Sequence, residues 1–495
     1  MSVLTDGLNP QQLAAVKHSG SPLLVVAGAG SGKTRVLTRR VAYLLAERNV
    51  APYEVLAITF TNKAAGEMKE RVTHLVGDRA KMMWVSTFHS ACVRILRREA
   101  ALLGYTNSFT IYDQSDSLRL VTLVMRDLNL DAKRYAPRAV AALISQAKNE
   151  LLGPADYLNQ SKDHFQEIVA QVFAIYQKRL SAANSMDFDD LIAKSVEVMQ
   201  RFPECRAKYR SRFKHILVDE YQDTNHAQYV LIKELVGSEQ EGFPPAELCV
   251  VGDADQSIYA FRGANIRNIL QFEADYLNAK TILLEQNYRS TQNILNAANS
   301  VIANNEGRKE KNLWSEAGAG ELITGYVAES EHDEADFVVQ QIRKLQESGK
   351  SNPGDTAIFY RTNAQSRVFE EVFMRVAIPY KVVGGVRFYE RKEIKDFLAY
   401  LRVIVNPNDE VSMRRIINTP KRGIGDRALD QLDLYAQANN ISFWQGLCEV
   451  EKNAEIAPRS AGSLVEFVKL IQSLQTLVEA KTRPSVIAQA TLEQS

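Results

Sequence analysis

An apolar run near the N-terminus leads directly into a glycine-rich turn that ends in Lys33-Thr34. Small residues in the turn allow consecutive backbone N–H groups to converge on phosphate oxygens, while the lysine can reach the β- and γ-phosphates of a nucleotide and the threonine hydroxyl can bind Mg²⁺. Apolar residues at positions 22–26 predict a buried strand, and apolar residues at helical spacing from Val36 to Leu45 predict a helix. The sequence therefore predicts a strand, a phosphate-binding loop and a helix, the start of an α/β fold.

The loop departs at one position from the strict pattern of such loops. The pattern G-x-x-x-x-G-K-[ST] places glycine at position 27, where this chain has Ala27. Alanine lacks free access to positive φ, so we expect a slightly different first turn. The alternative is a glycine-rich surface turn that binds no nucleotide. The residues predicted to contact the nucleotide here are Ala27, Gly28, Ala29, Gly30, Ser31, Gly32, Lys33, Thr34 and Arg35.

A second apolar strand, at residues 213–218, ends in the adjacent carboxylates Asp219 and Glu220. Beside a phosphate loop, Asp219 would hold with Thr34 the Mg²⁺ that bridges the β- and γ-phosphates, and Glu220 would orient or deprotonate the attacking water. One alternative is a polar strand end without a role. Another is a glycosidase-type acid pair, for which no second carboxylate at the required separation is evident.

The 495 residues are too many for one core and predict three or four domains. Hydrophobic content of 45% and charged content of 24% are typical of a globular protein, and no run of about 18 apolar residues could cross a bilayer. The N-terminus has no basic segment followed by an apolar one, so we expect a cytoplasmic protein with no membrane partner. The cysteines form no C-x-x-C pair, which favours buried free thiols over a disulfide framework or zinc site at Cys92, Cys205, Cys249 and Cys448.

The formal net charge of +1 shows no basic excess of the kind that indicates a nucleic-acid binder. Two local basic runs, residues 308–311 and 421–425, are candidates for such contacts, although as isolated runs we interpret them as solvated faces. Three carboxylates between Asp187 and Asp190 suggest a metal site. We favour a helix start with acids at the positive end of the helix dipole, because Leu191 and Ile192 follow.

Short apolar strand candidates alternate with amphipathic helices in the first part of the chain, which predicts a parallel sheet. They are residues 55–60, 84–88, 216–219, 248–252 and 281–284. Between residues 113 and 210 helical periodicity replaces the strand signal and predicts a helical insertion. Further strand candidates suggest a second α/β unit, at residues 322–327, 356–360 and 380–383. After about Gly385 the pattern is helical again.

Motif after motif, in chain order, the sequence resembles superfamily 1 DNA helicases of the UvrD/PcrA/Rep type. Besides the phosphate loop and Asp219-Glu220, the matching segments are residues 8–12, 58–65, 86–90, 251–263, 285–290, 360–366, 388–396 and 422–425. The resemblance covers the chain from Leu8 onward. It implies RecA-like parallel-sheet motor lobes with helical insertions, ATP and Mg²⁺ as cofactors, and ATP-driven 3′→5′ translocation on single-stranded DNA that separates duplexes. It also implies a role in DNA repair or replication, with protein partners unidentified.

The resemblance implies four domains. These are a first motor lobe at residues 1–107 and 204–284, a helical insertion at 108–203, the first part of a second motor lobe at 285–384, and an incomplete helical accessory domain at 385–495.

The resemblance also implies roles for four residues outside the two nucleotide motifs. Gln12 matches the residue that recognises adenine, although Asn9 and Pro10 also make an ordinary helix start. Gln256 matches the glutamine that senses the γ-phosphate. Tyr288 matches the residue that stacks on adenine, and Arg289 matches the arginine finger that meets the γ-phosphate from the second lobe.

Further matching positions imply contacts with single-stranded DNA and a duplex junction. They are Phe60, Thr61, Asn62, Thr87, His89, Tyr259, Phe261, Arg361, Asn363, Gly423 and Gly425. Tyr259 and Phe261 match positions on which bases stack, although the second is tryptophan in many relatives and Ala260 replaces a larger polar residue. Without the resemblance, aromatics at i and i+2 would form one buried face of a strand.

One part of the family pattern is absent. The family continues into a motif with histidine and glycine and a second arginine finger, and nothing of the kind follows Arg422. We therefore expect the N-terminal part of a longer helicase that, when isolated, binds nucleotide, hydrolyses it poorly, unwinds nothing and tends to aggregate. Two rival interpretations remain, a non-catalytic module that binds ATP and DNA, and the motor part of a helicase-nuclease.

Overall fold

The computed structural model describes residues 4–238, 244–306, 308, 310–383 and 388–495. These residues form two compact units. One comprises residues 1–320 and 399–495, and the other comprises residues 321–398. None of the helices in the described ranges is long and apolar enough to span a membrane.

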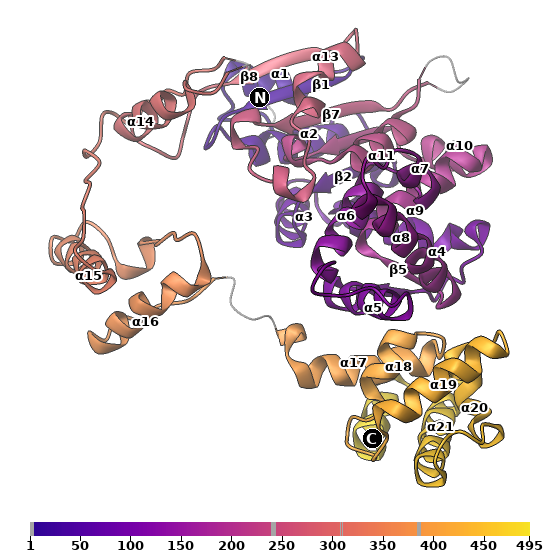
Figure 1. The fold of residues 1–495 in the computed structure, drawn as a ribbon. Helices are drawn as coiled ribbons and strands as arrows, with labels where there is room; N and C mark the ends of the chain where they lie inside the picture. The colour runs from indigo at the N-terminus through magenta and orange to yellow at the C-terminus, as the bar shows by residue number, and fades with distance from the viewer. Residues whose placement is uncertain (1–3, 239–243, 307, 309, 384–387) are drawn as a thin grey trace. The chain divides into compact units, whose positions relative to one another are not determined.

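A six-stranded parallel sheet organises the larger unit, with strand order β3-β2-β6-β7-β1-β8. Its strands are β1 (Leu23–Ala27), β2 (Val55–Thr59), β3 (Trp84–Thr87), β6 (His215–Val218), β7 (Glu247–Gly252) and β8 (Lys280–Leu284). The sheet brings distant segments side by side, since Val25 in β1 lies opposite Val251 in β7 and Ile282 in β8 (Figure 1). The five strands predicted after the phosphate loop in this part of the chain are confirmed, and so is the α/β class.

Each face of the sheet is covered by helices, which explains why its strands are continuous apolar runs. Leu23 and Val25 pack with α1 (Pro10–Lys17), α2 (Lys33–Ala46) and α3 (Asn62–Val76). Leu24 and Val26 point to the opposite face and pack in one cluster with α4 (Phe88–Glu99), α9 (Phe188–Arg201) and α11 (His226–Val236). Alternate residues of β1 thus belong to different cores, and every residue of this strand is buried.

The predicted insertion is helical and has its own core, formed by α5 (Gln114–Asp127), α6 (Pro137–Asn149), α7 (Pro154–Asn159) and α8 (His164–Ala182). After α9, α10 (Pro203–Arg212) packs instead on the core of the large sheet. The structure adds a short parallel pair, β4 (Thr110–Tyr112) with β5 (Ser185–Asp187), that the sequence did not predict.

The predicted helix start at the acidic run is confirmed, because Asp187 caps α9. The acids of this run do more than face a helix dipole. Buried Lys148 lies 2.6 Å from Asp187 and 2.9 Å from Asp190, so the run holds a buried cation from α6.

Further helices belong to the larger unit, and the helical pattern predicted after about Gly385 is confirmed. Two short helices, α12 (Arg267–Leu270) and α13 (Phe272–Asp275), precede β8, and α14 (Gln292–Ile302) follows it. The C-terminal part packs around one core with α18 (Glu410–Ile416), α19 (Asp426–Ala438), α20 (Phe443–Cys448) and α21 (Pro458–Glu479), and α22 (Pro484–Gln494) packs on α21. Three of the four cysteines are buried as predicted, whereas the prediction for Cys448 is wrong because it is exposed.

The smaller unit contains α15 (Glu331–Glu347) and α16 (Ser366–Arg375), which pack on each other, and part of α17 (Lys392–Val405). The strands predicted at residues 322–327, 356–360 and 380–383 are wrong, since none of these described residues is in a strand. A strand requires a neighbour for its backbone groups, and these segments have no paired strand in the described part of the chain. Their large apolar side chains are accordingly exposed, as at Val327 and Phe359.

Candidate nucleotide and DNA site

The phosphate loop joins the end of β1 to the start of α2, at the carboxyl edge of the parallel sheet where ligands bind in folds of this class. Gly30 and Gly32 have φ of 69° and 89°, a conformation that favours glycine. Ala27 is the last residue of β1, an extended position that needs no glycine, which explains how the loop tolerates the departure there. Ser31 Oγ donates to Gly28 O at 2.7 Å and holds the turn.

Lys33 connects this loop to the two other segments predicted to act on phosphate. Its Nζ donates to Glu220 Oε2 at 2.8 Å and to Gln256 Oε1 at 3.3 Å. Asp219 lies directly after β6 and is 8% exposed. Burial raises the pKa of the Asp219 carboxyl to about 6, the charge of Glu220 adds to this shift, and Lys33 opposes it. The structure thus brings together the predicted residues Lys33, Asp219, Glu220 and Gln256.

Two further polar residues of this cluster had no predicted role. Gln222 Nε2 donates to Glu220 Oε2 at 3.0 Å, and its Oε1 accepts from Asp253 N at 2.9 Å. The Asp253 carboxylate in turn accepts from Gln256 Nε2 at 2.5 Å. The nearby carboxyl of Asp223 has its pKa raised to about 6, mainly by burial and then by Glu220. Both Gln222 and Asp253 belong to recognisable motifs, but only the fold reveals that their side chains link the motifs.

Gln12 lies in the helix start that the sequence predicts and also contacts the phosphate loop. Asn9 caps α1 and forms a capping box with Gln12, which confirms the helix start. Gln12 is also fully buried, and its Nε2 donates to Ser31 O of the phosphate loop at 2.9 Å. Asn9 Nδ2 donates to Tyr288 OH at 2.9 Å, so the predicted adenine-stacking ring lies beside the same segment.

Residues 286–290 dock onto the phosphate loop through their backbone and Asn287. Tyr288 N donates to Gly30 O at 3.0 Å, and Asn287 Nδ2 donates to Ala29 O at 2.6 Å. Asn287 Oδ1 accepts a hydrogen bond from Arg289 N at 2.8 Å, which fixes the position of the Arg289 backbone. The Tyr288 and Arg289 side chains remain exposed. No role was predicted for Asn287, although its position within the matching segment at residues 285–290 indicated that it could contribute to the site.

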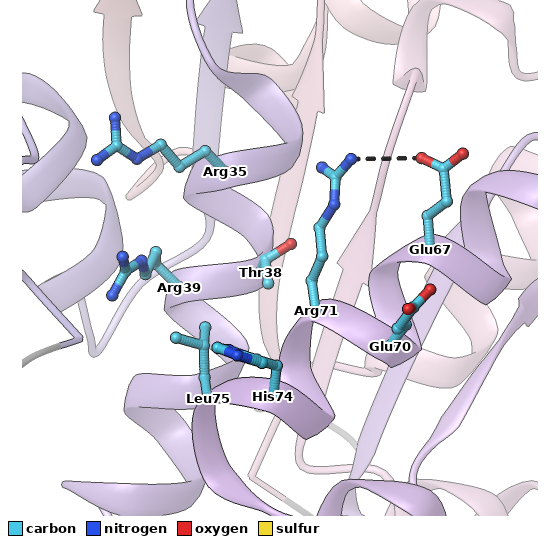
Figure 2. Close-up of a pocket in the computed structure, with 8 residues that line it drawn as sticks. All are labelled: Arg35, Thr38, Arg39, Glu67, Glu70, Arg71, His74 and Leu75. Carbon is cyan, nitrogen blue, oxygen red and sulfur yellow. Dashed lines mark hydrogen bonds and ion pairs between the residues drawn. The ribbon is translucent and has the colours of Figure 1, made fainter.

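A groove of about 520 Å³ lies between α2 and α3 and includes Arg35 of the predicted nucleotide-binding set (Figure 2). Arg35 and Arg39 project from α2, while Arg71 and His74 project from α3. Arg71 is paired with Glu67 at 3.4 Å. The groove therefore lies beside the first two turns of α2, just beyond the phosphate loop.

The predicted DNA-binding aromatics form one cluster from two segments. The ring centroids of Phe60 and Tyr259 are 5.0 Å apart, and those of Tyr259 and Phe261 are 6.0 Å apart. Phe261 is 76% exposed and lies in a short 3-10 helix. The alternative of a buried strand face is therefore wrong for Phe261, and most of its ring is accessible to a base.

The polar DNA-binding candidates of the larger unit's sheet region lie at the starts of α3 and α4. Thr61 caps α3, and Thr87 caps α4. Asn62 Oδ1 accepts a hydrogen bond from Ser90 Oγ at 3.4 Å, which connects the two helix starts. The His89 ring lies 5.9 Å from that of Phe188, and burial lowers the pKa of its imidazole.

The remaining predicted DNA-binding residues lie outside the aromatic cluster and outside the starts of α3 and α4. Arg361 and Asn363 belong to the smaller unit, where Arg361 N donates to Gln365 Oε1 at 2.9 Å. Gly423 has φ of 73°, and Gly425 precedes α19 as its N-cap.

Neither basic run is simply a solvated face, so this expectation is wrong. Arg422 is partly buried and donates to Tyr400 OH at 2.6 Å. The Lys311 side chain is 3% exposed and pairs with Asp253. Such pairings join residues far apart in sequence, which a local charge pattern does not reveal.

Two family models match the chain. One is described as the UvrD/REP helicase N-terminal domain and matches residues 8–277, and the other as the UvrD-like helicase C-terminal domain and matches residues 282–452.

The chain is also similar to curated proteins that are named as ATP-dependent DNA helicases. It is 60% identical over 479 residues to UvrD1 of Mycobacterium tuberculosis, covering 95% of this chain and 62% of that protein. It is 57% identical over 487 residues to UvrD1 of Mycobacterium leprae, covering 96% and 63%. It is 52% identical over 474 residues to PcrA of Staphylococcus aureus, covering 96% and 64%. The chain thus spans less than two thirds of the length of these relatives.

Proposed function

The chain belongs to the UvrD/REP helicase family, and on that premise we propose that it is the ATP-hydrolysing motor of a DNA helicase that moves 3′→5′ along single-stranded DNA. The observation that carries the proposal is the convergence of Lys33, Glu220 and Gln256 beside Asp219 at one edge of the sheet. We further propose that this motor works on cytoplasmic DNA in repair or replication.

The residues at this edge fit a nucleotide with Mg²⁺. Gly30 and Gly32 keep the loop free of side chains, and a Cβ at either position would lie 2.9 Å or less from a neighbouring side chain. A carboxyl with its pKa raised by burial, such as Asp219, gains a counter-charge when a cation binds. Thr34 and Asp219 would hold the ion, which would neutralise charge developing on the phosphates.

Each of the chain's own residues then has one task. The Lys33 ammonium binds the β- and γ-phosphates in place of its present partner Glu220. Glu220 is thereby released to orient the attacking water and accept its proton. Gln256 senses the γ-phosphate, and Arg289 provides positive charge where the transition state gains negative charge.

Recognition of the adenine base is assigned to residues around the phosphate loop other than those that act on the phosphates. Gln12 is held by Ser31 O and by its capping box, so its amide is oriented before adenine binds. Tyr288, tied through its backbone to Gly30, offers an exposed ring for stacking, and Arg35 in the first turn of α2 lines the groove. Preorganised groups of this kind lower the entropic cost of binding.

DNA binding rests on exposed aromatic rings and on helix starts. Phe60, Tyr259 and Phe261 form a stacking surface that tolerates any base, as a moving enzyme requires. Tyr259 is three residues from Gln256, so a shift at the γ-phosphate would be passed over a short stretch of chain to the DNA surface. This short connection favours a motor over the rival of a passive module that binds ATP and DNA separately.

The test measures phosphate release by the purified chain with and without oligothymidylate. We expect slow hydrolysis that DNA stimulates, and any strand separation should prefer a 3′-tailed duplex to a 5′-tailed one. Nucleotide and DNA binding without any hydrolysis would contradict the proposal and support the passive module.

A further inference from the structure

The segment after α14 supplies a buried cation to the acids that follow β7. Lys311 Nζ donates to Asp253 Oδ1 at 2.5 Å and also to Asp255 Oδ2. The side chains of Lys311 and Asp253 are each 3% exposed. Arg308 adds a second cation, with its guanidinium 3.1 Å from Asp255 Oδ2, and also donates to Lys311 O at 3.0 Å. Lys311 is thus the cation that directly faces Asp253 within the described residues.

Asp253 in turn sets the orientation of Gln256. Its Oδ2 accepts from Gln256 Nε2 at 2.5 Å, which leaves Gln256 Oε1 directed to Lys33 Nζ at 3.3 Å. An ionised carboxylate only accepts hydrogen bonds, so the amide nitrogen of Gln256 must face it. Without Lys311 the Asp253 carboxylate would lose the donor that holds it in place, and a displaced carboxylate no longer dictates which end of the Gln256 amide faces it.

The position of Lys311 is itself fixed from the nucleotide site. Two residues further on, Leu313 packs so closely on the phosphate loop that a Cβ at Gly28 would lie 2.2 Å from its Cδ2. Asn287 N donates to Trp314 O at 2.8 Å. Residues 311–314 therefore contact the phosphate loop, the acids after β7 and the segment that contains Arg289.

We propose that Lys311 is a positioning residue for the γ-phosphate sensor: its ammonium anchors the Asp253 carboxylate, and Asp253 holds the Gln256 amide in the orientation that reads the γ-phosphate. The inference deepens the proposed function and rests on it. It assigns the part of the chain matched by the C-terminal family domain a direct influence on whether the site distinguishes a nucleoside triphosphate from a diphosphate.

The experiment compares dissociation constants of the full chain for Mg²⁺-ATPγS and Mg²⁺-ADP, by competition with a fluorescent ADP analogue. We expect K311M to lose about tenfold of the preference for ATPγS, the size expected of one hydrogen bond to a charged group. Affinity for ADP should stay unchanged. Q256A should give the same loss, and K311R, which retains the charge, should retain most of the preference.

A rescue variant separates positioning from simple damage to the fold. In D253N/K311M, the introduced amide offers a neutral carbonyl acceptor that needs no counter-charge, so this variant should regain preference relative to K311M. The matched control is K350M, since Lys350 pairs with Glu321 on the surface of the smaller unit. Circular dichroism melting curves establish that each variant is folded.

The outcomes distinguish the inference from the proposed function. Wild-type chain that binds neither nucleotide would contradict both. Wild-type chain that prefers ATPγS, together with a K311M variant that keeps this preference or loses affinity for both nucleotides equally, would overturn the inference alone. A D253N/K311M variant with no recovery would also overturn it.

Discussion

Lys33 and Glu220 come from segments 187 residues apart and form an ion pair with 2.8 Å between Nζ and Oε2. The lysine follows the phosphate loop after β1 and the glutamate follows β6, and β7 alone lies between these two strands. The proposed phosphate ligand and the proposed base therefore meet at the same carboxyl edge of the sheet. Because one ammonium cannot serve both partners equally, phosphate binding and release of the base are linked. This relationship leads to the first two predictions.

Lys33→Ala should reduce ATP hydrolysis by about 10²-fold or more, the cost of removing one charged group aimed at the reacting phosphates. The fold should persist, because Glu220 is 33% exposed and can be solvated once its partner is gone. Steady-state phosphate release measures the effect. The matched control is Lys81→Ala, a surface lysine paired with Asp78. Turnover by Lys33→Ala close to that of the parent chain would remove this lysine from the site.

Glu220→Gln should bind Mg²⁺-ATP and fail at hydrolysis. A glutamine carbonyl can still accept from Lys33, but an amide does not accept the proton of the attacking water. Equilibrium binding of labelled ATP, followed by single-turnover hydrolysis, separates the two steps. Glu67→Gln, which changes a surface pair with Arg71, is the control. Equal loss of binding and hydrolysis would assign Glu220 to nucleotide binding instead.

Asp219→Asn should stabilise the nucleotide-free chain near neutral pH and do so less in acid. The pKa of Asp219 is raised from 3.8 to about 6, so the folded state holds its proton more tightly than the unfolded state. The cost of keeping the buried carboxylate ionised is therefore present above about pH 6 and is lost as pH falls toward 4. The shift corresponds to about 3 kcal/mol at neutral pH.

Urea unfolding of Asp219→Asn and the parent chain at pH 5, 6, 7 and 8 measures this dependence. The difference in unfolding free energy should grow from pH 5 to pH 7 and then level off. Asp78→Asn, at an exposed position, should show no such trend. A difference that stays constant over this range would contradict the raised pKa. The same variant should bind Mg²⁺ more weakly in the presence of ATP.

Phe261→Ala should weaken binding of single-stranded DNA by about 1–3 kcal/mol without loss of stability. The ring is 76% exposed, so its removal leaves no cavity in the core. Fluorescence anisotropy with a labelled oligonucleotide, repeated at two salt concentrations, measures affinity and the contribution of phosphate contacts. Leu277→Ala, at an exposed leucine outside the proposed site, is the control. Unchanged affinity for Phe261→Ala would exclude stacking on this ring.

The features that could be predicted from the sequence are those that a short stretch of residues determines by itself. The phosphate loop, its flanking strand and helix, and the five later strands of the large sheet followed from short apolar runs and turn residues. The resemblance then supplied the roles of residues such as Gln256. Strands at residues 322–327 and 356–360 were predicted from the same signal and are not formed, because strand structure also requires a partner that the local sequence does not specify.

The polar network could not be predicted for a different reason. Lys311 and Asp253 are 58 residues apart, and Lys148 and Asp187 are 39 apart, so their pairing exists only once the chain has folded. In sequence, Lys311 belongs to a basic run and Asp187 to an acidic one, and such runs are ordinarily solvated. Burial of charge within the fold is therefore the feature that pattern reasoning missed most consistently.

The position of β8 as the outermost strand beside β1 has a kinetic consequence for Arg289, the proposed arginine finger. β8 runs parallel to β1, so Leu284 ends beside Ala27, at the edge where the phosphate loop begins. Arg289 follows five residues later, a stretch of chain that reaches at most about 18 Å. If Arg289 is the arginine finger, the short chain segment keeps it near the phosphate loop, and its approach to a bound phosphate is an intramolecular encounter at high effective concentration. This short segment keeps Arg289 close to the phosphate loop whatever conformation the following residues adopt.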